Sequence, residues 1–282
     1  MSSSSLFSDG ASQPIAFRDE LPGLATAPRL AIPPLAEVAP ASRLEVRPAP
    51  EMVSCGIGEI DALTGGLPRG CLTEICGEAS SGRTSLLLAT LAAATQRQEA
   101  CALVDVSDAF DPISAAKMGI QFERVLWVRC GKTSPQRFRA EKNFFQALGM
   151  ETLEQALRVT DLLLQSGGFG LVIIDLGDVP VKNARRIPLT SWFRFQRAVE
   201  RAPTVLVVVS QTPCTQSCAM LVLRMKASEK LLALSFQLSA KSPAHTQLFE
   251  GLLLEGELLR SRLQRKPVHS VIGFAKTVTR TG

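Results

Sequence analysis

At 282 residues and 46% hydrophobic content, the chain is long enough for one good-sized domain with extensions, and apolar enough for a substantial core. Its net charge of +5 is compatible with an anionic partner but does not demand one. No uninterrupted apolar run reaches the roughly 18 residues of a membrane span, and the N-terminus has no signal-peptide pattern, so we expect a cytoplasmic protein without a membrane partner.

Residues 1–50 are the first region along the chain, and we predict a Pro/Ser-rich disordered extension. They carry 8 of the 17 prolines. Proline fixes its backbone angle and has no N–H to donate, so this spacing is unfavourable for a long helix or a central strand.

Residues 51–240 alternate between strand-like and helix-like patterns, which predicts an α/β core. Near-continuous apolar strands that alternate with helices are typical of a mostly parallel sheet covered on both faces. We expect two further strands, 219–225 and 231–238, to be antiparallel at the C-terminal side. The expected strands of the parallel part are 72–76, 102–106, 125–129, 171–175 and 204–210, and the expected helices are 56–63, 86–95, 111–118, 152–165 and 191–201.

The segment between the first buried strand and the helix over 86–95 reads Gly77-Glu-Ala-Ser-Ser-Gly-Arg-Thr84, close to the phosphate-loop pattern G-x-x-x-x-G-K-[ST]. In such a loop, backbone N–H groups and the helix N-terminus face a phosphate. Arg83 occupies the usual lysine position, and Thr84 offers a hydroxyl to Mg²⁺. The alternative is a Gly/Ser turn that merely caps the helix.

Two polar residues at the ends of later strands complete a candidate site. Asp175 follows four apolar residues at the end of its strand, where phosphate-loop proteins hold Mg²⁺. Gln211 follows the next strand and could sense a terminal phosphate. An ordinary cap or turn is the alternative interpretation of Asp175, and a polar residue after a strand is by itself unremarkable.

In their order along residues 55–225, these features resemble the RecA family of bacterial recombinases. The similar segments are GGLPRG, TEICGEASSGRTS, ALVDVSDAFDP, LVIIDL and VVVSQ. Several phrases are more similar to the degenerate ImuA-type accessory proteins of SOS mutagenesis, namely GLPRGCLTEI, SGRTSLLL and IPLTSWFRFQRAVE. The resemblance implies a RecA-like P-loop NTPase core with ATP and Mg²⁺ as cofactors.

The resemblance also implies positions for the cofactors. Asp111 matches the acidic residue that the family places against adenine, and Gln211 matches the glutamine that links nucleotide state to the DNA-binding loops. Asp175 matches the magnesium-side aspartate, with Thr84 as the second metal-side residue. The phosphate-loop matches are Gly77, Ser80, Ser81, Gly82, Arg83, Thr84 and Ser85.

Departures from the family pattern predict poor ATP hydrolysis, and we assign no catalytic residue. Ser107 stands where a recombinase has its catalytic glutamate, and serine is no general base. The planar guanidinium of Arg83 also differs from a compact ammonium. Losing one well-placed stabilising group commonly costs about 10²–10³ in rate. Residues 1–50 are moreover too proline-rich for the family's N-terminal docking helix.

We predict a basic C-terminal extension over residues 241–282. From Leu258 onward it has no acidic residue, and a basic tail is a candidate contact for nucleic acid or an acidic protein surface. A solvated terminal segment is the alternative. The basic residues of this tail are Arg260, Arg262, Arg265, Lys266, Lys276 and Arg280.

The resulting hypothesis is an accessory protein of DNA repair or SOS translesion mutagenesis that binds nucleotide weakly or structurally. It would act through DNA-repair or polymerase-like protein partners, with single-stranded DNA and self-association as further candidates. One alternative is an active DNA-dependent ATPase recombinase. A division inhibitor is another, but the preserved glycines and Thr84 argue against it, because RecA-like folds in that role occur without a phosphate loop.

Overall fold

The computed structural model describes residues 48–130, 142–227, 251–263 and 270–276. Most of the predicted N-terminal extension and the predicted strand 231–238 lie outside these residues. Among the helices that are described, none combines the length and the apolar character needed to cross a membrane.

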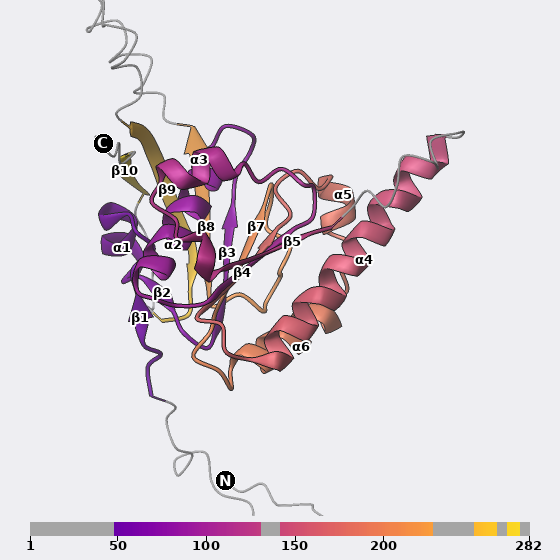
Figure 1. Cartoon of the computed structure of the whole chain (residues 1–282), viewed down its shortest axis with the longest axis horizontal. Coiled ribbons are helices and arrows are strands. Elements are labelled where there is room, and N and C mark those ends of the chain that lie inside the picture. Colours follow the sequence, from indigo (N-terminus) through magenta and orange to yellow (C-terminus); the bar gives the residue numbers. More distant parts are fainter. Residues whose placement is uncertain (1–47, 131–141, 228–250, 264–269, 277–282) are drawn as a thin grey trace, which may run out of the picture. The chain divides into compact units, whose positions relative to one another are not determined.

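An eight-stranded sheet forms the centre of the fold (Figure 1), in the order β10-β9-β8-β3-β7-β6-β4-β5. Neighbouring strands from β8 to β5 pair in parallel, whereas β9 and β10 are antiparallel. The predicted α/β class, with antiparallel strands at the C-terminal side, is therefore confirmed. The strands are β3 (Cys71–Cys76), β4 (Cys101–Asp105), β5 (Val125–Arg129), β6 (Leu171–Asp175), β7 (Val205–Ser210), β8 (Leu221–Ala227), β9 (Gly251–Ser261) and β10 (Ser270–Lys276), beside a separate pair of β1 (Met52–Val53) and β2 (Leu67–Pro68).

The direction of β8 corrects one expectation. A short connection after β7 favours an antiparallel hairpin, but residues 211–220 return along the sheet, so β8 starts at the same edge as β3 and pairs with it in parallel. Only its other neighbour, β9, is antiparallel to it. Strands β9 and β10, which lie within the predicted C-terminal extension, are part of the main sheet.

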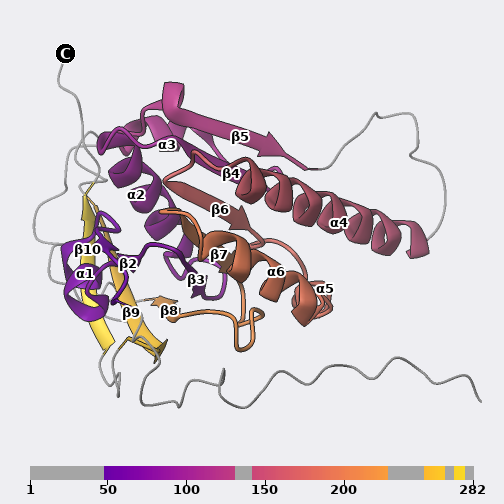
Figure 2. The ribbon, with the colours of Figure 1, turned by 90° about the horizontal axis from the view of Figure 1, so that it is seen from below.

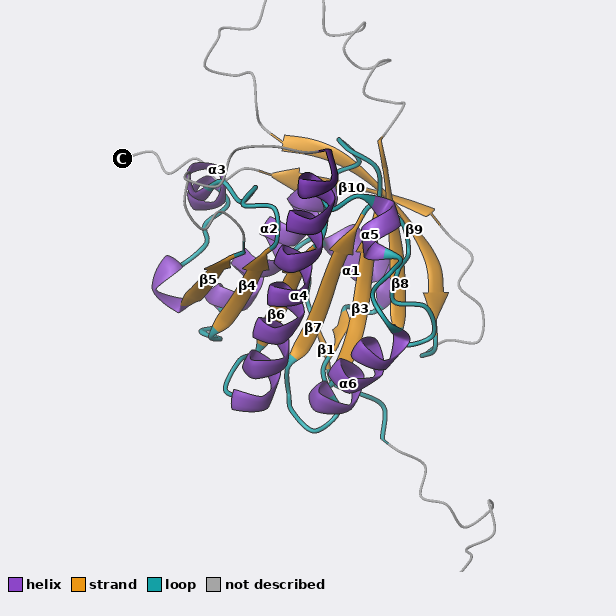
Figure 3. Ribbon diagram, turned by 90° about the vertical axis from the view of Figure 1, so that its right-hand side faces the viewer, coloured by secondary structure: helices purple, strands orange, loops and turns teal. Residues whose placement is uncertain are grey.

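Helices cover both faces of the sheet because strand side chains alternate between two apolar cores. One core joins α1, α2 and α3 to strand residues such as Ile75 and Ile173. The other joins α4 and α6 to residues such as Leu72 and Ile174. Figure 2 places α1 and α2 on one side of the strands, and Figure 3 shows α4 and α6 in front of them. The helices are α1 (Gly58–Thr64), α2 (Arg83–Gln96), α3 (Pro112–Lys117), α4 (Lys142–Ser166), α5 (Val181–Ala184) and α6 (Leu189–Val199), with a 3₁₀ turn at Phe122–Arg124.

Candidate functional site

The phosphate-loop segment connects β3 to α2, so the strand–loop–helix context of the motif is present. Gly82 precedes the helix with φ +88°, in the left-handed region that glycine adopts without strain. A Cβ at Gly82 would lie 2.2 Å from a methyl carbon of Leu254 in β9. The backbone conformation therefore favours glycine here, and its lack of a side chain lets the loop pack closely against Leu254.

The Arg83 side chain is buried and hydrogen-bonded to the protein itself. Its guanidinium donates to the carbonyl oxygen of Gly77, at the start of the loop, and to that of Gly177, after β6, at 2.8 Å. A third contact reaches Asp178 Oδ1 at 3.4 Å. That carboxylate is 61% exposed, so the pair adds little stability beyond the carbonyl bonds. Arg83 thus ties the phosphate loop to the turn that follows β6.

Asp175 ends β6 and is a carboxylate with few partners. The backbone N–H of Gly177 donates to its Oδ1 at 2.8 Å. The pKa of Asp175 is raised to about 6, chiefly by burial; the nearby Asp105 and Asp178 contribute to the rise, and the Gly177 hydrogen bond and Arg83 oppose it. At neutral pH the group is therefore mostly ionised but poorly solvated, which favours a cation ligand.

One cavity of about 200 Å³ brings four of the predicted residues together: Arg83, Thr84, Asp111 and Asp175. A threonine hydroxyl and a carboxylate are oxygen ligands of the kind that Mg²⁺ takes, so this pair fits the predicted metal. The cavity is smaller than the roughly 300–1,000 Å³ of typical ligand pockets. It therefore accommodates a phosphate and metal more readily than a whole nucleotide.

Asp111 lies at the rim of this cavity as the N-cap of α3. Its carboxylate accepts hydrogen bonds from the backbone N–H groups of Ile113 and Ser114, both at 3.1 Å, and from Ser114 Oγ at 2.6 Å. These bonds, the Ser114 hydroxyl first, lower the pKa of Asp111. A helix cap thus accounts for the aspartate locally, while its position also permits contact with a bound group.

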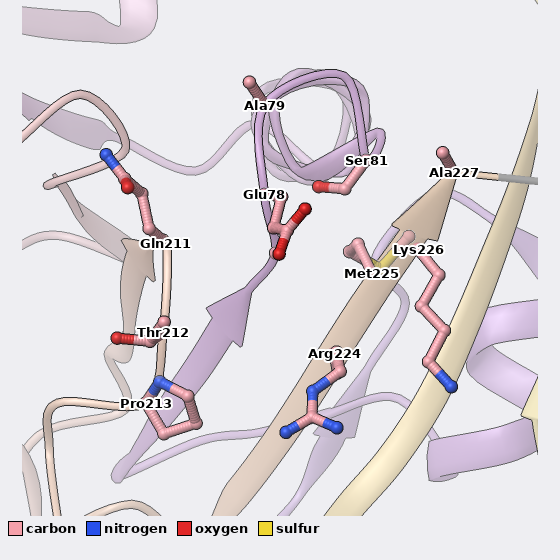
Figure 4. A pocket seen from close by; sticks show the side chains of 11 residues that line it. Glu78, Ala79, Ser81, Gln211, Thr212, Pro213, Arg224, Met225, Lys226 and Ala227 are labelled. Carbon is pink, nitrogen blue, oxygen red and sulfur yellow. The ribbon is translucent and has the colours of Figure 1, made fainter. Parts of the chain in front are cut away.

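A second cavity, of about 410 Å³, lies against the start of the phosphate loop and the loop that follows β7 (Figure 4). It collects Gly77, Ser81 and Gln211 together with Arg224 and Lys226 of β8. Within the described residues, the buried Ser81 hydroxyl has no hydrogen-bond partner. The predicted site residues are thus divided between two cavities, and Ser80, Gly82 and Ser85 line neither.

Gln211 and the two cations of β8 already have protein contacts. Gln211 Nε2 donates to the carbonyl oxygen of Val179 at 3.3 Å, which connects it to the turn after β6. Lys226 and Arg224 approach the carboxylate of Glu257 in β9 at 2.8 and 3.7 Å. Glu257 was not among the predicted site residues. Its ion pairs join two strands that are distant in the sequence, so no local sequence pattern predicts them.

The turn after β4 is where a recombinase-like general base would stand. Ser107 is exposed there. The neighbouring Asp108 has φ +56° and a two-point ion pair with Arg129, at 2.6 and 2.7 Å. Asp105 accepts hydrogen bonds from the backbone of Ala109 and Phe110 and from the indole of Trp127. The carboxylates of Asp105 and Asp108 therefore hold the turn and connect it to β5.

Glu74 in β3 is a functional candidate that the sequence analysis missed. Its buried carboxylate accepts from the backbone N–H of Cys214 at 2.6 Å and from Thr215 Oγ1 at 2.5 Å, with weaker bonds from Ser210 Oγ and the Thr215 N–H. It thereby fixes the loop that begins at Gln211. A charged residue inside the apolar strand LTEIC is the sequence signal that could have pointed to it.

Arg260 and Arg262 from the basic tail hold the same loop. Their guanidinium groups donate to the backbone carbonyl oxygens of Gln216 and Ser217. Two of the six tail cations thus have a structural use. The remaining four lie outside the part of the chain whose side chains are described.

Known proteins resemble parts of this chain. The RecA N-terminal domain family matches residues 44–137. Protein RecA of Ectopseudomonas oleovorans is 38% identical over 111 residues, which is 39% of this chain and 26% of that protein. Protein RecA of Brucella canis is 36% identical over 127 residues, 44% of this chain and 30% of that protein. The matches therefore span about a quarter to a third of the length of these relatives.

Among solved structures, the RadB recombinase has a similar fold, with a TM-score of 0.51 at 19% identity, covering 78% of this chain and 94% of that one. At this identity the likeness concerns the fold. Since it covers 78% of the chain, it extends beyond the segment that matches in sequence. Residues 44–137 are therefore similar in sequence to the RecA N-terminal domain, and the chain shares a RecA-like fold.

Proposed function

We propose that this chain is a RecA-like accessory protein of DNA repair and SOS translesion mutagenesis. It binds ATP and Mg²⁺ weakly or structurally, without efficient hydrolysis. It acts in the cytoplasm through DNA-repair or polymerase-like protein partners, with single-stranded DNA as a further candidate. The RecA-like similarity supports the repair context, and the resemblance to ImuA-type proteins supports the accessory role.

The observation that carries this proposal is the engagement of Arg83. A residue that stabilises charge on a transferring phosphoryl group must direct its donors at that group. The donors of Arg83 are instead directed at the carbonyl oxygens of Gly77 and Gly177. Reaching a phosphate would mean giving up those bonds inside a buried site, where an unpaired polar group is costly.

The turn after β4 supports the same conclusion about hydrolysis. General-base catalysis needs an acceptor within hydrogen-bond reach of the attacking water. Ser107 supplies no basic group, and the Asp108 carboxylate is held by Arg129. The residue that would stabilise phosphate charge, Arg83, is therefore engaged by the protein itself. The general base is replaced by Ser107.

Nucleotide binding can persist without turnover. The backbone of Gly77–Gly82 and the N-terminus of α2 would hold phosphate oxygens, with Thr84 and Asp175 on the metal side and Asp111 toward the base. When bound, Mg²⁺ would neutralise phosphate charge next to Asp175. Asp175 is mostly deprotonated above its raised pKa of about 6, so metal-dependent binding should strengthen as pH rises through 6.

The alternative is an active DNA-dependent ATPase that binds single-stranded DNA and exchanges strands. The specific observation in its favour is the gathering of Thr84, Asp111 and Asp175 in one cavity beside the phosphate loop. This alternative requires Arg83 to leave its carbonyl partners and another group to replace the missing base.

A genetic comparison in the host organism distinguishes the two functions. The gene is deleted, and damage-induced mutation frequency and homologous recombination are measured in the same strain. If the chain is an accessory protein, we expect a loss of induced mutation with recombination intact, restored by the wild-type chain. Loss of recombination in the deletion strain would overturn the accessory role and favour the alternative.

A further inference from the structure

Helices α4 and α6 pack together on the face of the sheet that lies opposite α2, and a groove of about 320 Å³ opens between them. It is separate from the two cavities beside the phosphate loop and shares no residue with them. From α4 it is lined by Leu153, Glu154, Leu157 and Arg158, and from the α5–α6 segment by Arg186, Ile187, Pro188, Ser191 and Arg194.

The floor of this α4–α6 groove is apolar. Leu153 and Ile187 are buried in the core beneath it, while Leu157 is partly exposed and Pro188 is exposed. A second hollow shares Glu154 and Arg158 and continues along α4 to Leu162, which is 66% exposed. The surface thus combines an apolar floor with a neighbouring hollow in which the apolar Val159 and Leu162 lie beside charged residues, as in sites that take up the side chains of a bound peptide.

The rim of the groove is basic. Residues 181–201, which include α5 and α6, contain six Lys or Arg residues and a single acidic residue, Glu200, giving a formal charge of +5. This equals the net charge of the whole chain. The segment that forms this wall of the groove is therefore strongly basic, and it attracts a negatively charged partner.

Two of the rim arginines are available to such a partner. Arg158 and Arg186 are exposed, and neither has an ion-pair partner within the described ranges. Arg194 pairs with Asp161 at 3.0 Å and lies over the Phe195 ring, so it is less available. Glu154 offsets part of the charge on the α4 side. The free cations thus lie on opposite walls of the groove, Arg158 on α4 and Arg186 on the connection between α5 and α6.

We propose that the α4–α6 groove docks a partner protein through a short segment in which acidic residues flank a large apolar side chain. The apolar side chain would enter between Leu157 and Pro188. Its acidic neighbours would pair with Arg158 and Arg186, for which guanidinium–carboxylate geometry is well suited. This inference deepens the proposed function and rests on its expectation of protein partners.

Nucleic acid is the competing occupant of a basic surface, and the lining favours protein. Single strands are held by aromatic side chains on which bases stack. None of the residues that line the groove is aromatic. A mostly apolar floor between two cations suits the mixed chemistry of a peptide better than a uniformly charged phosphate backbone.

Peptide selection on the full chain tests the proposal. Random 12-residue peptides are displayed, selected on the wild-type chain, and counter-selected on the variant R158E/R186E. The matched control is R185E/R201E, which removes the same charge from exposed arginines of the same segment that do not line the groove. The neutral pair R158Q/R186Q replaces the charge reversal if the latter lowers the melting temperature.

The expected consensus has at least two Asp or Glu residues around a Leu, Ile or Phe. In fluorescence anisotropy, such a peptide should bind R158E/R186E about tenfold or more weakly than wild type, and R185E/R201E nearly as well as wild type. Leu157→Gln should weaken binding without changing the charge. A consensus without acidic residues, or equal binding to both double variants, would overturn the proposal.

Two controls separate this proposal from its competitors. If a labelled oligo(dT) strand binds the wild-type chain, loses affinity in R158E/R186E and displaces the selected peptides, the groove is a nucleic-acid site and the protein-docking proposal is wrong. The groove variants leave the nucleotide cavity intact, so they should bind Mg²⁺-ATP as the wild type does. Failure of the peptide test therefore leaves the genetic test of the accessory role unaffected.

Discussion

Two carboxylates, Glu74 in β3 and Asp175 at the end of β6, belong to the same parallel part of the sheet but have opposite surroundings. Glu74 is buried and accepts hydrogen bonds from Ser210, the last residue of β7, and from three groups of the segment that follows β7. Asp175 accepts one bond, from the Gly177 N–H, and its pKa is raised to about 6. A buried carboxylate with all its partners supplied by the protein stabilises the fold, whereas one short of partners is suited to a ligand.

Asp105, at the end of β4, which pairs with β6 on the side away from β7, resembles Glu74. Two backbone N–H groups and the Trp127 indole occupy its oxygens. Its neighbour β6 therefore carries the carboxylate of this sheet edge that is best placed to hold a cation. Variants at five positions would break or sharpen this contrast.

The largest effect is expected for Glu74→Ala, which leaves several buried donors without an acceptor. Each orphaned donor costs about 1–3 kcal/mol, so we expect the free energy of unfolding to fall by about 3 kcal/mol or more. Urea denaturation measures it. Glu74→Gln keeps an acceptor oxygen and should lose less. A loss below about 1 kcal/mol for the alanine variant would mean that Glu74 does not organise the loop after β7.

Asp175→Asn should instead raise the free energy of unfolding. A carboxyl group whose pKa rises on folding, here from 3.8 to about 6, contributes its stability below the lower value and loses it as pH rises through the upper one. Removing the charge should therefore stabilise the chain at pH 8 by up to about 3 kcal/mol, and hardly at all below pH 4. The change is read from denaturation curves across this pH range.

Asp178→Asn is the control for Asp175, because the Asp178 carboxylate is largely exposed and should shift the stability little. If the two variants behave alike, or if Asp175→Asn destabilises the chain at pH 8, then Asp175 is a structural carboxylate like Glu74.

Arg83→Lys should lower stability by about 1–2 kcal/mol, because one ammonium cannot bond the Gly77 and Gly177 carbonyl oxygens as the guanidinium does. It should not produce ATP hydrolysis, because Ser107 remains no base. Melting temperature and phosphate release measure the two effects. Substantial turnover by this single variant would remove the argument from Ser107.

The smallest effect is expected for Asp108→Asn. Its ion pair with Arg129 is near the surface, where such pairs contribute about 0.2–1 kcal/mol. Any nucleotide turnover of the wild-type chain should be unchanged in the variant. A selective loss of turnover, with stability preserved, would identify Asp108 as the general base and not as a residue that only pairs with Arg129.

The sequence predicts much of the fold because its signals are local. Apolar runs such as LVIID and VLVVVS mark the buried strands, and the glycine spacing marks the loop before α2. The direction of β8 was predicted wrongly because it depends on where residues 211–220 attach. Those contacts come from Glu74, Arg260 and Arg262, which are distant in the sequence.

The candidate site was predictable in its residue types but not in its geometry. Thr84, Asp111 and Asp175 could be singled out one by one, and the structure places them around one cavity. Gln211 and Ser81 line the other one. Nothing in the sequence reveals that Arg83 reaches the carbonyl oxygen of Gly177, since a long side chain can take many directions from the same backbone position.

The most direct test of the central claim is the binding and turnover of Mg²⁺-ATP by the purified wild-type chain, with and without single-stranded DNA. We predict Mg²⁺-dependent binding that weakens in Asp175→Asn, and no turnover that responds to DNA. DNA-stimulated hydrolysis would contradict the account, because Arg83 would then have to release its carbonyl partners and some group other than Ser107 would have to activate the water.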